Sequence, residues 1–343
     1  MSDMPETLVQ FSDSEKQLLQ TAEKPSEERG TLTPDLLELA RSKKLYHLAV
    51  PKELGGAELP VPSLIGIFEE ASFLNGSFGW NLTLGAGAGI FGAYMDPGFA
   101  REVFADPKAF ITGSGYPAGR AQRTVDGSFL ASGLWKYASG SPYATLFTAS
   151  CWGAGSDADN PDVIALAFYP GEVKRLGTWN SYGLTATASH DFEVVEQQIP
   201  KRRSFKMVAQ PEYAGKALYR FPFMPFACAT LAASLLGITR AFIDEAGPDH
   251  AHLSASVLAH RTRLHETVQS LWESCKIGEP VSEDEASSVQ QAAVELAGVC
   301  RTTAFALYQA CGMKVLDRDS RLNRTWRDLM TAGQHAMLQN TGA

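Results

Sequence analysis

Cysteine is scarce in this chain, and the few cysteines present are not spaced as metal ligands or as a disulfide framework. They stand at positions 151, 228, 275, 300 and 311, with no CxxC pair among them. Structural zinc sites use closely spaced pairs of cysteine or histidine, and small secreted domains use dense, regular cysteine patterns. The sequence therefore predicts a reduced, cytoplasmic protein without disulfides and without a metal site.

The chain also has fewer basic than acidic residues. The 343 residues include 30 Lys and Arg against 38 Asp and Glu, which gives a formal net charge of −8 at pH 7. The basic run Lys201 to Arg203 is too short to follow a phosphate backbone. Nucleic acid is therefore not expected as a partner.

Three further signals are missing: a leader, a membrane span and a nucleotide-binding loop. The N-terminus is polar and acidic up to Lys24, whereas a signal peptide begins basic and continues apolar. The longest apolar run, residues 221–238, is interrupted by prolines and polar residues, so a buried helix is expected there rather than a membrane span. No GxGxxG or GxxxxGK[ST] motif occurs, which argues against a Rossmann or P-loop site.

What is present follows a simple order of helices, strands and helices. Residues 5–105 carry helical signals, such as Thr33 followed by Pro34 at a helix start. From residue 225 to the end the pattern is helical again. Short β-rich runs lie between these blocks, at 111–116, 121–125, 128–136, 144–151, 163–169 and 192–199. The order predicts an α+β, mostly α protein with an N-terminal helical domain (1–108), a central β-sandwich or barrel (109–208) and a C-terminal helical bundle (209–343).

A candidate catalytic pair lies near the C-terminus, in a segment that begins like a helix at Ser320. Asp328 and His335 are seven residues apart, a spacing that predicts a carboxylate and an imidazole on one face of this helix. A carboxylate can orient an imidazole, and an imidazole can move a proton near neutral pH. On spacing alone, a structural ion pair between Arg327 and Asp328 beside a packed histidine is the commoner interpretation.

Four segments, in chain order, resemble the acyl-CoA dehydrogenase fold family, and within it the reduced-flavin-dependent monooxygenases that hydroxylate aromatic compounds. They are residues 50–56 (VPKELGG), 126–141 with WKYASGS at its end, 177–191 (GTWNSYGLTATASHD) and 320–335. Together they extend over nearly the whole chain. The resemblance implies a helical domain, a central β-domain and a C-terminal four-helix bundle, with flavin between the last two.

The resemblance also implies roles for single positions. Tyr137 matches a residue that lies over the flavin ring, and Ser139 one whose hydroxyl reaches the N5/C4a edge. Thr187 and Ser189 match a Thr-Gly-Ser motif near the flavin, with Ala188 in place of the glycine, where a methyl group could hinder close approach. From residue type alone, Tyr137 and Ser139 would pass as a strand residue and a turn residue.

The choice between dehydrogenase and monooxygenase rests on a missing carboxylate. A dehydrogenase needs a base for the α-proton of an acyl thioester, and residues 329–339, where that family branch places it, contain neither Glu nor Asp. His335 stands instead where the monooxygenase branch places its catalytic histidine. An imidazole in a dry pocket can manage the proton of a C4a-hydroperoxyflavin or activate a phenol.

Fewer signals point to the substrate. Trp80, Asn81, Tyr116, Trp179 and Phe223 could line a pocket, although such residues are more often part of a core. Of these, Trp179 lies in the third family-like segment and is also expected to contact the flavin. The chain ends eight residues after His335, whereas relatives continue further. A shortened bundle is expected, which could weaken flavin binding or change the oligomer.

The sequence thus predicts a monooxygenase with His335 and Ser139 as catalytic residues. It would take reduced flavin, FADH2 or FMNH2, from a separate NAD(P)H-dependent flavin reductase and use O2 to oxidise a small aromatic or heteroatom-bearing molecule. A homotetramer or homodimer is expected. Two alternatives stay open: an FAD-dependent acyl-CoA dehydrogenase-like desaturase with a base elsewhere in the chain, and a catalytically silent relative that binds a ligand or partner.

Overall fold

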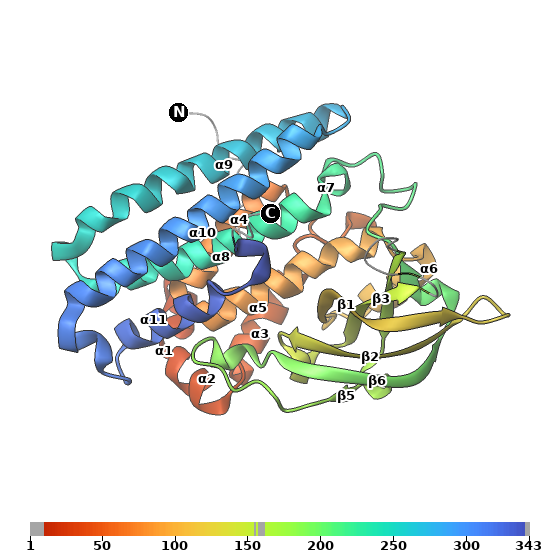
Figure 1. The fold of residues 1–343 in the computed structure, drawn as a ribbon, viewed down its shortest axis with the longest axis horizontal. Helices are drawn as coiled ribbons and strands as arrows, with labels where there is room; N and C mark the ends of the chain where they lie inside the picture. The colour runs from red at the N-terminus through yellow and green to blue at the C-terminus, as the bar shows by residue number, and fades with distance from the viewer. Residues whose placement is uncertain (1–9, 154–155, 157–161, 340–343) are drawn as a thin grey trace.

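The computed structural model describes residues 10–153, 156 and 162–339, and its elements follow the predicted order of helices, sheet and helices (Figure 1). Local signals start several of the first helices, because the side chains of Ser12, Thr33, Asn75 and Asp96 each accept a hydrogen bond from the first turn. The block comprises α1 (Asp13–Thr21), α2 (Glu23–Arg29), α3 (Pro34–Ser42), α4 (Val61–Leu74), α5 (Gly76–Gly87) and α6 (Pro97–Phe104), with 3-10 turns η1 (Leu45–His47), η2 (Lys52–Leu54) and η3 (Ala88–Ala93).

The middle of the chain forms one seven-stranded sheet in the order β5-β6-β2-β1-β3-β4-β7. Neighbouring strands are antiparallel except β1 and β3. The strands are β1 (Ile111–Arg123), β2 (Phe129–Ala138), β3 (Leu146–Gly153), β4 (Val163–Phe168), β5 (Lys174–Arg175), β6 (His190–Ile199) and β7 (Ser204–Phe205), with 3-10 turns η4 (Ser141–Tyr143), η5 (Pro170–Glu172), η6 (Thr185–Thr187) and η7 (Lys201–Arg203). The runs at 111–116 and 121–125 are a single strand, because a bulge between Ser114 and Gly119 shifts the register without ending β1.

The sheet curls around a core of its own. Ring centroids of Trp135 on β2 and Phe168 on β4 lie 6.1 Å apart, and those of Phe147 on β3 and Phe192 on β6 lie 5.1 Å apart. Each pair joins strands that are not neighbours in the sheet. The sheet therefore closes over one face, as a sandwich or barrel does.

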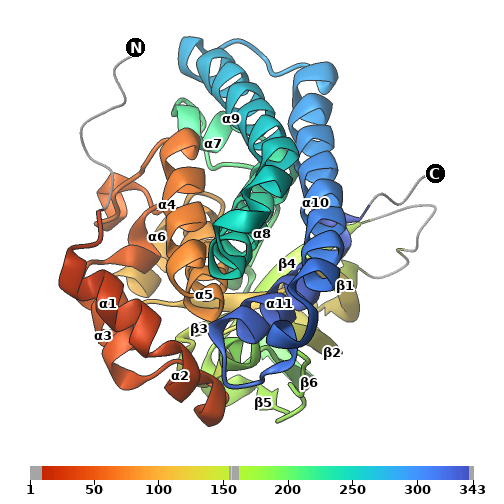
Figure 2. The same ribbon diagram turned by 90° about the vertical axis from the view of Figure 1, so that its left-hand side faces the viewer.

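The C-terminal block is a bundle of long helices. It contains α7 (Ala217–Arg220), α8 (Phe223–Ala246), α9 (Ser254–Ile277), α10 (Glu283–Cys311) and α11 (Arg321–Ala332), with 3-10 turns η8 (Pro248–Leu253), η9 (Gly312–Leu316) and η10 (Ala336–Leu338). Figure 2 shows α8 between α4 and α10, with α11 crossing towards the sheet. The fold is thus α+β and mostly α, as the sequence predicts.

Helix α8 contains the long apolar run. Among the described residues it is the one helix that is long and apolar enough to cross a membrane, and 83% of that apolar window is buried inside the protein. Close packing of α8 against α4 explains the burial, because a Cβ at Gly237 would lie 2.2 Å from the Glu69 carbonyl oxygen. The run is a core helix, as expected.

The helix that carries Asp328 ends earlier than the sequence predicts. Ser320 caps it as expected, with its side chain accepting from the Asn323 N–H at 3.1 Å, but α11 stops at Ala332. His335 lies beyond it, where its side chain caps η10. The prediction that Asp328 and His335 share a helical face is therefore wrong, since the chain turns between them.

Candidate active site

Helix α11 fixes the loop that leads into η6. The Asp328 carboxylate accepts the Leu184 N–H at 2.5 Å, and the Thr331 hydroxyl accepts the Gly183 N–H at 2.9 Å. Gly183 lies directly on the helix, since a Cβ there would be 2.1 Å from the Arg327 carbonyl oxygen. The loop between β5 and β6 is thereby fixed to the helical bundle.

Asp328 and Arg327 are structural residues, but they do not pair as the sequence suggests. Arg327 forms its ion pair with Glu27 of α2, and its Nε donates to Asn323 at 2.8 Å. No salt bridge between Arg327 and Asp328 occurs in the part of the chain that the structure describes. Burial raises the pKa of Asp328 to about 6, against the effect of the Leu184 N–H. The carboxylate is thus occupied by the backbone and not by His335.

Three predicted flavin contacts form a buried chain of hydroxyls. Ser139 lies 2.7 Å from Ser189, Ser189 lies 2.7 Å from Thr187, and the Thr187 hydroxyl donates to the Leu184 carbonyl at 2.7 Å. All three side chains are buried. Backbone contacts keep the two segments together, because the Gly140 N–H donates to the Thr187 carbonyl at 2.7 Å. Segments 50 residues apart in sequence therefore build one site.

The direction of this chain follows from the number of protons. Each hydroxyl has one proton to donate. Thr187 gives its proton to the Leu184 carbonyl, so Ser189 must donate to Thr187, and Ser139 must donate to Ser189. The remaining lone pair of Ser139 is then an acceptor. The site is therefore arranged to receive a hydrogen bond at Ser139.

Replacing Thr187 with Val should reverse this preference. The variant keeps the shape but leaves Ser189 without its acceptor, which should cost about 1–2 kcal/mol of unfolding free energy. Ser139 would then be free to donate, so a ligand with an acceptor atom should gain affinity relative to one with a donor. Dissociation constants for reduced and oxidised flavin check this, with Thr239→Val of α8 as control for loss of a buried hydroxyl. An unchanged ratio would contradict the assigned direction.

Tyr137 and Trp179 form an aromatic pair beside these hydroxyls. Their rings meet edge to face with centroids 6.0 Å apart, and the Trp179 indole N–H donates to the Leu184 carbonyl at 3.0 Å. The Tyr137 side chain is 64% exposed. The exposed Tyr137 ring therefore offers one flat aromatic face to a planar ligand, while the Trp179 ring stands at a steep angle to it.

Ala188 adopts the conformation for which glycine is the usual residue. Its φ and ψ are both 47°, in the left-handed region. The residue is fully buried, so its methyl group lies against protein atoms. The structure thus accommodates the replacement of the family glycine through local strain.

His335 lies against Trp80 of α5. The two ring centroids are 5.9 Å apart. The His335 Nδ1 accepts the Met337 N–H at 3.3 Å, so in the neutral imidazole the proton is on Nε2. Burial lowers the pKa of His335 below its ordinary value. The side chain is therefore a neutral hydrogen-bond donor at pH 7.

The other predicted pocket residues separate in the structure. Phe223 packs on Phe91, with centroids 5.8 Å apart, at the start of α8. Tyr116 is 77% exposed on β1, and within the described residues no recorded contact joins it to the other candidates. Sequence reasoning did not single out Gly183, because its role depends on contact with α11. It also missed Tyr46 of η1, which packs edge to face on Phe110.

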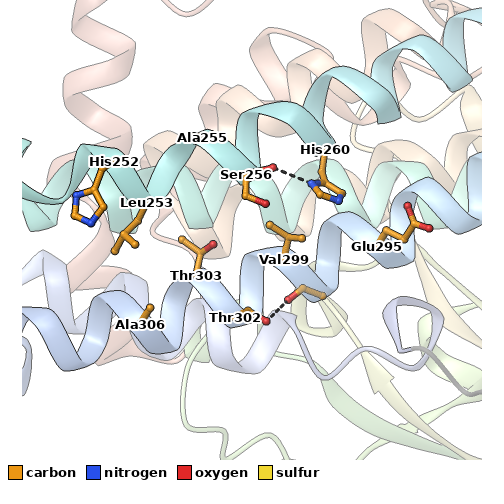
Figure 3. Close-up of a pocket in the computed structure, with 11 residues that line it drawn as sticks. His252, Leu253, Ala255, Ser256, His260, Glu295, Val299, Thr302, Thr303 and Ala306 are labelled. Carbon is orange, nitrogen blue, oxygen red and sulfur yellow. Dashed lines mark hydrogen bonds between the residues drawn. The ribbon is translucent and has the colours of Figure 1, made fainter.

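A separate groove lies away from these residues. It is an open groove of about 670 Å³ between α9 and α10 on the outside of the bundle (Figure 3). Its lining includes His260, whose Nδ1 lies 2.8 Å from the Ser256 carbonyl oxygen of the same helix. Its lining contains none of the predicted site residues.

Comparison with known proteins links this geometry to one family. Residues 246–340 match the model described as acyl-CoA dehydrogenase, C-terminal domain. The chain is 26% identical over 341 residues to an indole-3-acetate monooxygenase of Pseudomonas putida, covering 91% of this chain and 86% of that protein. It is 21% identical over 322 residues to the Mycobacterium tuberculosis flavin-dependent monooxygenase, oxygenase subunit HsaA, covering 85% and 81%. The solved structure of XiaF from Streptomyces sp., in complex with FADH2 and glycerol, superimposes with a TM-score of 0.83 at 19% identity, covering 94% and 89%.

Proposed function

Because this chain belongs to the acyl-CoA dehydrogenase fold family, we propose that it is a flavin-dependent monooxygenase that uses reduced flavin and O2 to oxygenate a small aromatic or heteroatom-bearing molecule. The names of the relatives, an indole-3-acetate monooxygenase among them, support this activity. The observation that carries the proposal is the hydroxyl chain that makes Ser139 an acceptor.

The residues around Ser139 fit a reduced flavin. Its N5 bears a hydrogen, whereas oxidised N5 is an acceptor, so the Ser139 lone pair matches the reduced form. The exposed face of Tyr137, supported edge to face by Trp179, would cover the flavin ring. When bound, the reduced flavin supplies the two electrons that activate O2. In this proposal, Ser139 contacts the flavin, and Ser189 and Thr187 orient the Ser139 hydroxyl.

His335 would act on the substrate side. Its Nε2–H can donate to an oxygen that becomes negative during oxygen transfer, and Trp80 shields it from water. Because the Met337 N–H occupies Nδ1, the neutral ring is a donor first, and it becomes a base at Nε2 only after the proton moves to Nδ1. Trp80, Tyr116 and Phe223 remain proposed substrate contacts.

A desaturase is the weaker alternative. Its base would have to be a carboxylate near His335, but residues 329–339 contain none. The Oδ1 of Asp328 accepts the Leu184 N–H, and its Oδ2 is buried against Gly76, where an added Cβ would lie 2.7 Å away. Bleaching of flavin-loaded protein by an acyl thioester would nevertheless support that alternative.

Partners follow from the same proposal. A relative is named an oxygenase subunit, so a separate NAD(P)H-dependent flavin reductase should supply the reduced flavin. We also propose that the protein is cytoplasmic and forms a homodimer or homotetramer. Its flavin would be either FAD or FMN. Light scattering of the full chain, with and without flavin, tests the assembly.

Rapid mixing tests the activity. Protein with chemically reduced FAD or FMN, mixed with ¹⁸O2 and indole, should delay the appearance of oxidised flavin and yield a product with one ¹⁸O atom. Reoxidation at the rate of free flavin, with hydrogen peroxide as the only product across a panel of indoles and phenols, would instead support a catalytically silent relative.

A further inference from the structure

A fully buried amide lies beside the candidate site without any partner. Asn81 of α5 has no exposed surface, and neither its Oδ1 nor its Nδ2 has a hydrogen-bond partner. Leaving a buried donor or acceptor unpaired costs about 1–3 kcal/mol, and native structures pair nearly all of them. An amide with both atoms unpaired is therefore the mark of a ligand site rather than of core packing.

The position of Asn81 on α5 directs it towards the active site. Its neighbour Trp80 contacts the His335 ring. Gly85 follows Asn81 by one helical turn on the same face of α5. It lies against Phe110, since a Cβ at Gly85 would be 2.3 Å from the Phe110 ring. The α5 helix also packs on η6, which carries Thr187. Asn81 thus belongs to a helix that contacts His335 through Trp80, Phe110 through Gly85, and the turn η6.

Two unpaired phenols surround the same Phe110 ring. Tyr46 and Tyr143 pack edge to face on it, with centroids 4.6 and 4.9 Å away, and both hydroxyls are buried without a partner. Gly140, next to Ser139, touches this ring as well, since its Cβ would be 2.6 Å away. Burial raises the pKa of both tyrosines, so both stay protonated. Two neutral phenols therefore surround Phe110, and Gly85, one helical turn after Asn81, lies against the same ring.

We propose that Asn81, together with Tyr46 and Tyr143, forms the polar end of the substrate pocket and binds a neutral hydrogen-bonding group of an aromatic substrate, such as an indole N–H or a phenolic hydroxyl. The inference rests on the proposed function and names its substrate class. An amide offers one donor side and one acceptor side, and each phenol offers both. None of the three side chains carries a charge, and each can pair with a neutral donor or acceptor.

A matched pair of probes tests the proposal. Indole and benzothiophene have nearly the same shape, but only indole has an N–H. Calorimetric titration of the full chain under anaerobic conditions, with and without reduced flavin, should show indole bound about 10-fold more tightly, as one buried hydrogen bond predicts. Asn81→Leu should abolish this preference. Its Tm without a probe should not fall, because the unpaired amide is gone.

Two further variants complete the experiment. Thr83→Val, on the same helix but with its hydroxyl bonded to the Gly79 carbonyl at 2.8 Å, should keep the preference for indole. Tyr143→Phe should reduce the preference for indole several-fold without removing any packing. This variant tests the proposal if Asn81→Leu does not fold. Equal binding of the two probes to the wild type, or an unchanged preference in both Asn81→Leu and Tyr143→Phe, would overturn the proposal. Because binding is measured without turnover, an absence of ¹⁸O incorporation would reject the proposed function and leave this result intact.

Discussion

A Gly183→Ala variant should lose about 3 kcal/mol of unfolding free energy and should fail to bind reduced flavin. Glycine is needed there because its Cα lies on the α11 backbone, where a Cβ would be 2.1 Å from the Arg327 carbonyl carbon and its oxygen. Backbone cannot yield as a flexible side chain can, so overpacking has its full cost. The displaced loop would also lose the Asp328 and Thr331 contacts that position η6. Urea denaturation and flavin titration measure both effects.

The same loop provides a control for this prediction. Gly177 has no atom within 4 Å of an added Cβ, so Gly177→Ala should change stability by less than about 0.5 kcal/mol. If Gly183→Ala behaved like Gly177→Ala, the close contact between the loop and α11 would not be what joins the two domains.

A His335→Ala variant should slow formation of the oxygenated product by about 100- to 10,000-fold, which is the usual contribution of a positioned acid or base. The proton-bearing Nε2 is lost, while the fold should persist because His335 follows the end of α11 and caps only η10. Single-turnover product analysis measures the rate. His260→Ala, on the outer groove between α9 and α10, should leave the rate unchanged.

The pH profile separates a catalytic role from a structural one. The ordinary pKa of histidine is 6.5, and burial lowers that of His335. The wild-type rate should therefore stay constant as the pH falls to about 6.5 and drop only below it, when a second proton displaces the Met337 N–H from Nδ1. A His335→Ala enzyme should lack this drop. An equal drop in both would show that another group controls the reaction.

The starts of several helices could be predicted from the sequence because they depend on local hydrogen bonds. The Thr33-Pro34 start of α3 and the Ser320 start of α11 lie where the sequence places them, because a cap involves only residues within one turn. The order of helices, sheet and helices is equally visible, since side-chain periodicity reports which face is buried. The resemblance to one family then placed Ser139 and Ser189 at one site, although they are distant in sequence.

The end of α11 shows where local inference failed. Spacing put Asp328 and His335 on one face only if the helix continued, but Gly333 follows its last residue and the chain turns there. The Arg327–Asp328 pair failed for a related reason. Arg327 found a partner 300 residues away in Glu27, and no neighbouring residue indicates such a contact.

By itself the sequence determined the class of fold, the starts of helices, the absence of a carboxylate at residues 329–339 and the position of a candidate histidine. Only the tertiary structure decided the direction of the Ser139–Ser189–Thr187 hydroxyl chain, the neutral tautomer of His335 and the unpaired state of Asn81. The physical reason is that each of these depends on which polar atoms remain without a partner. That is a property of the packed chain, since Ser139 meets Ser189 from 50 residues away and the unpaired state of Asn81 depends on every element around it.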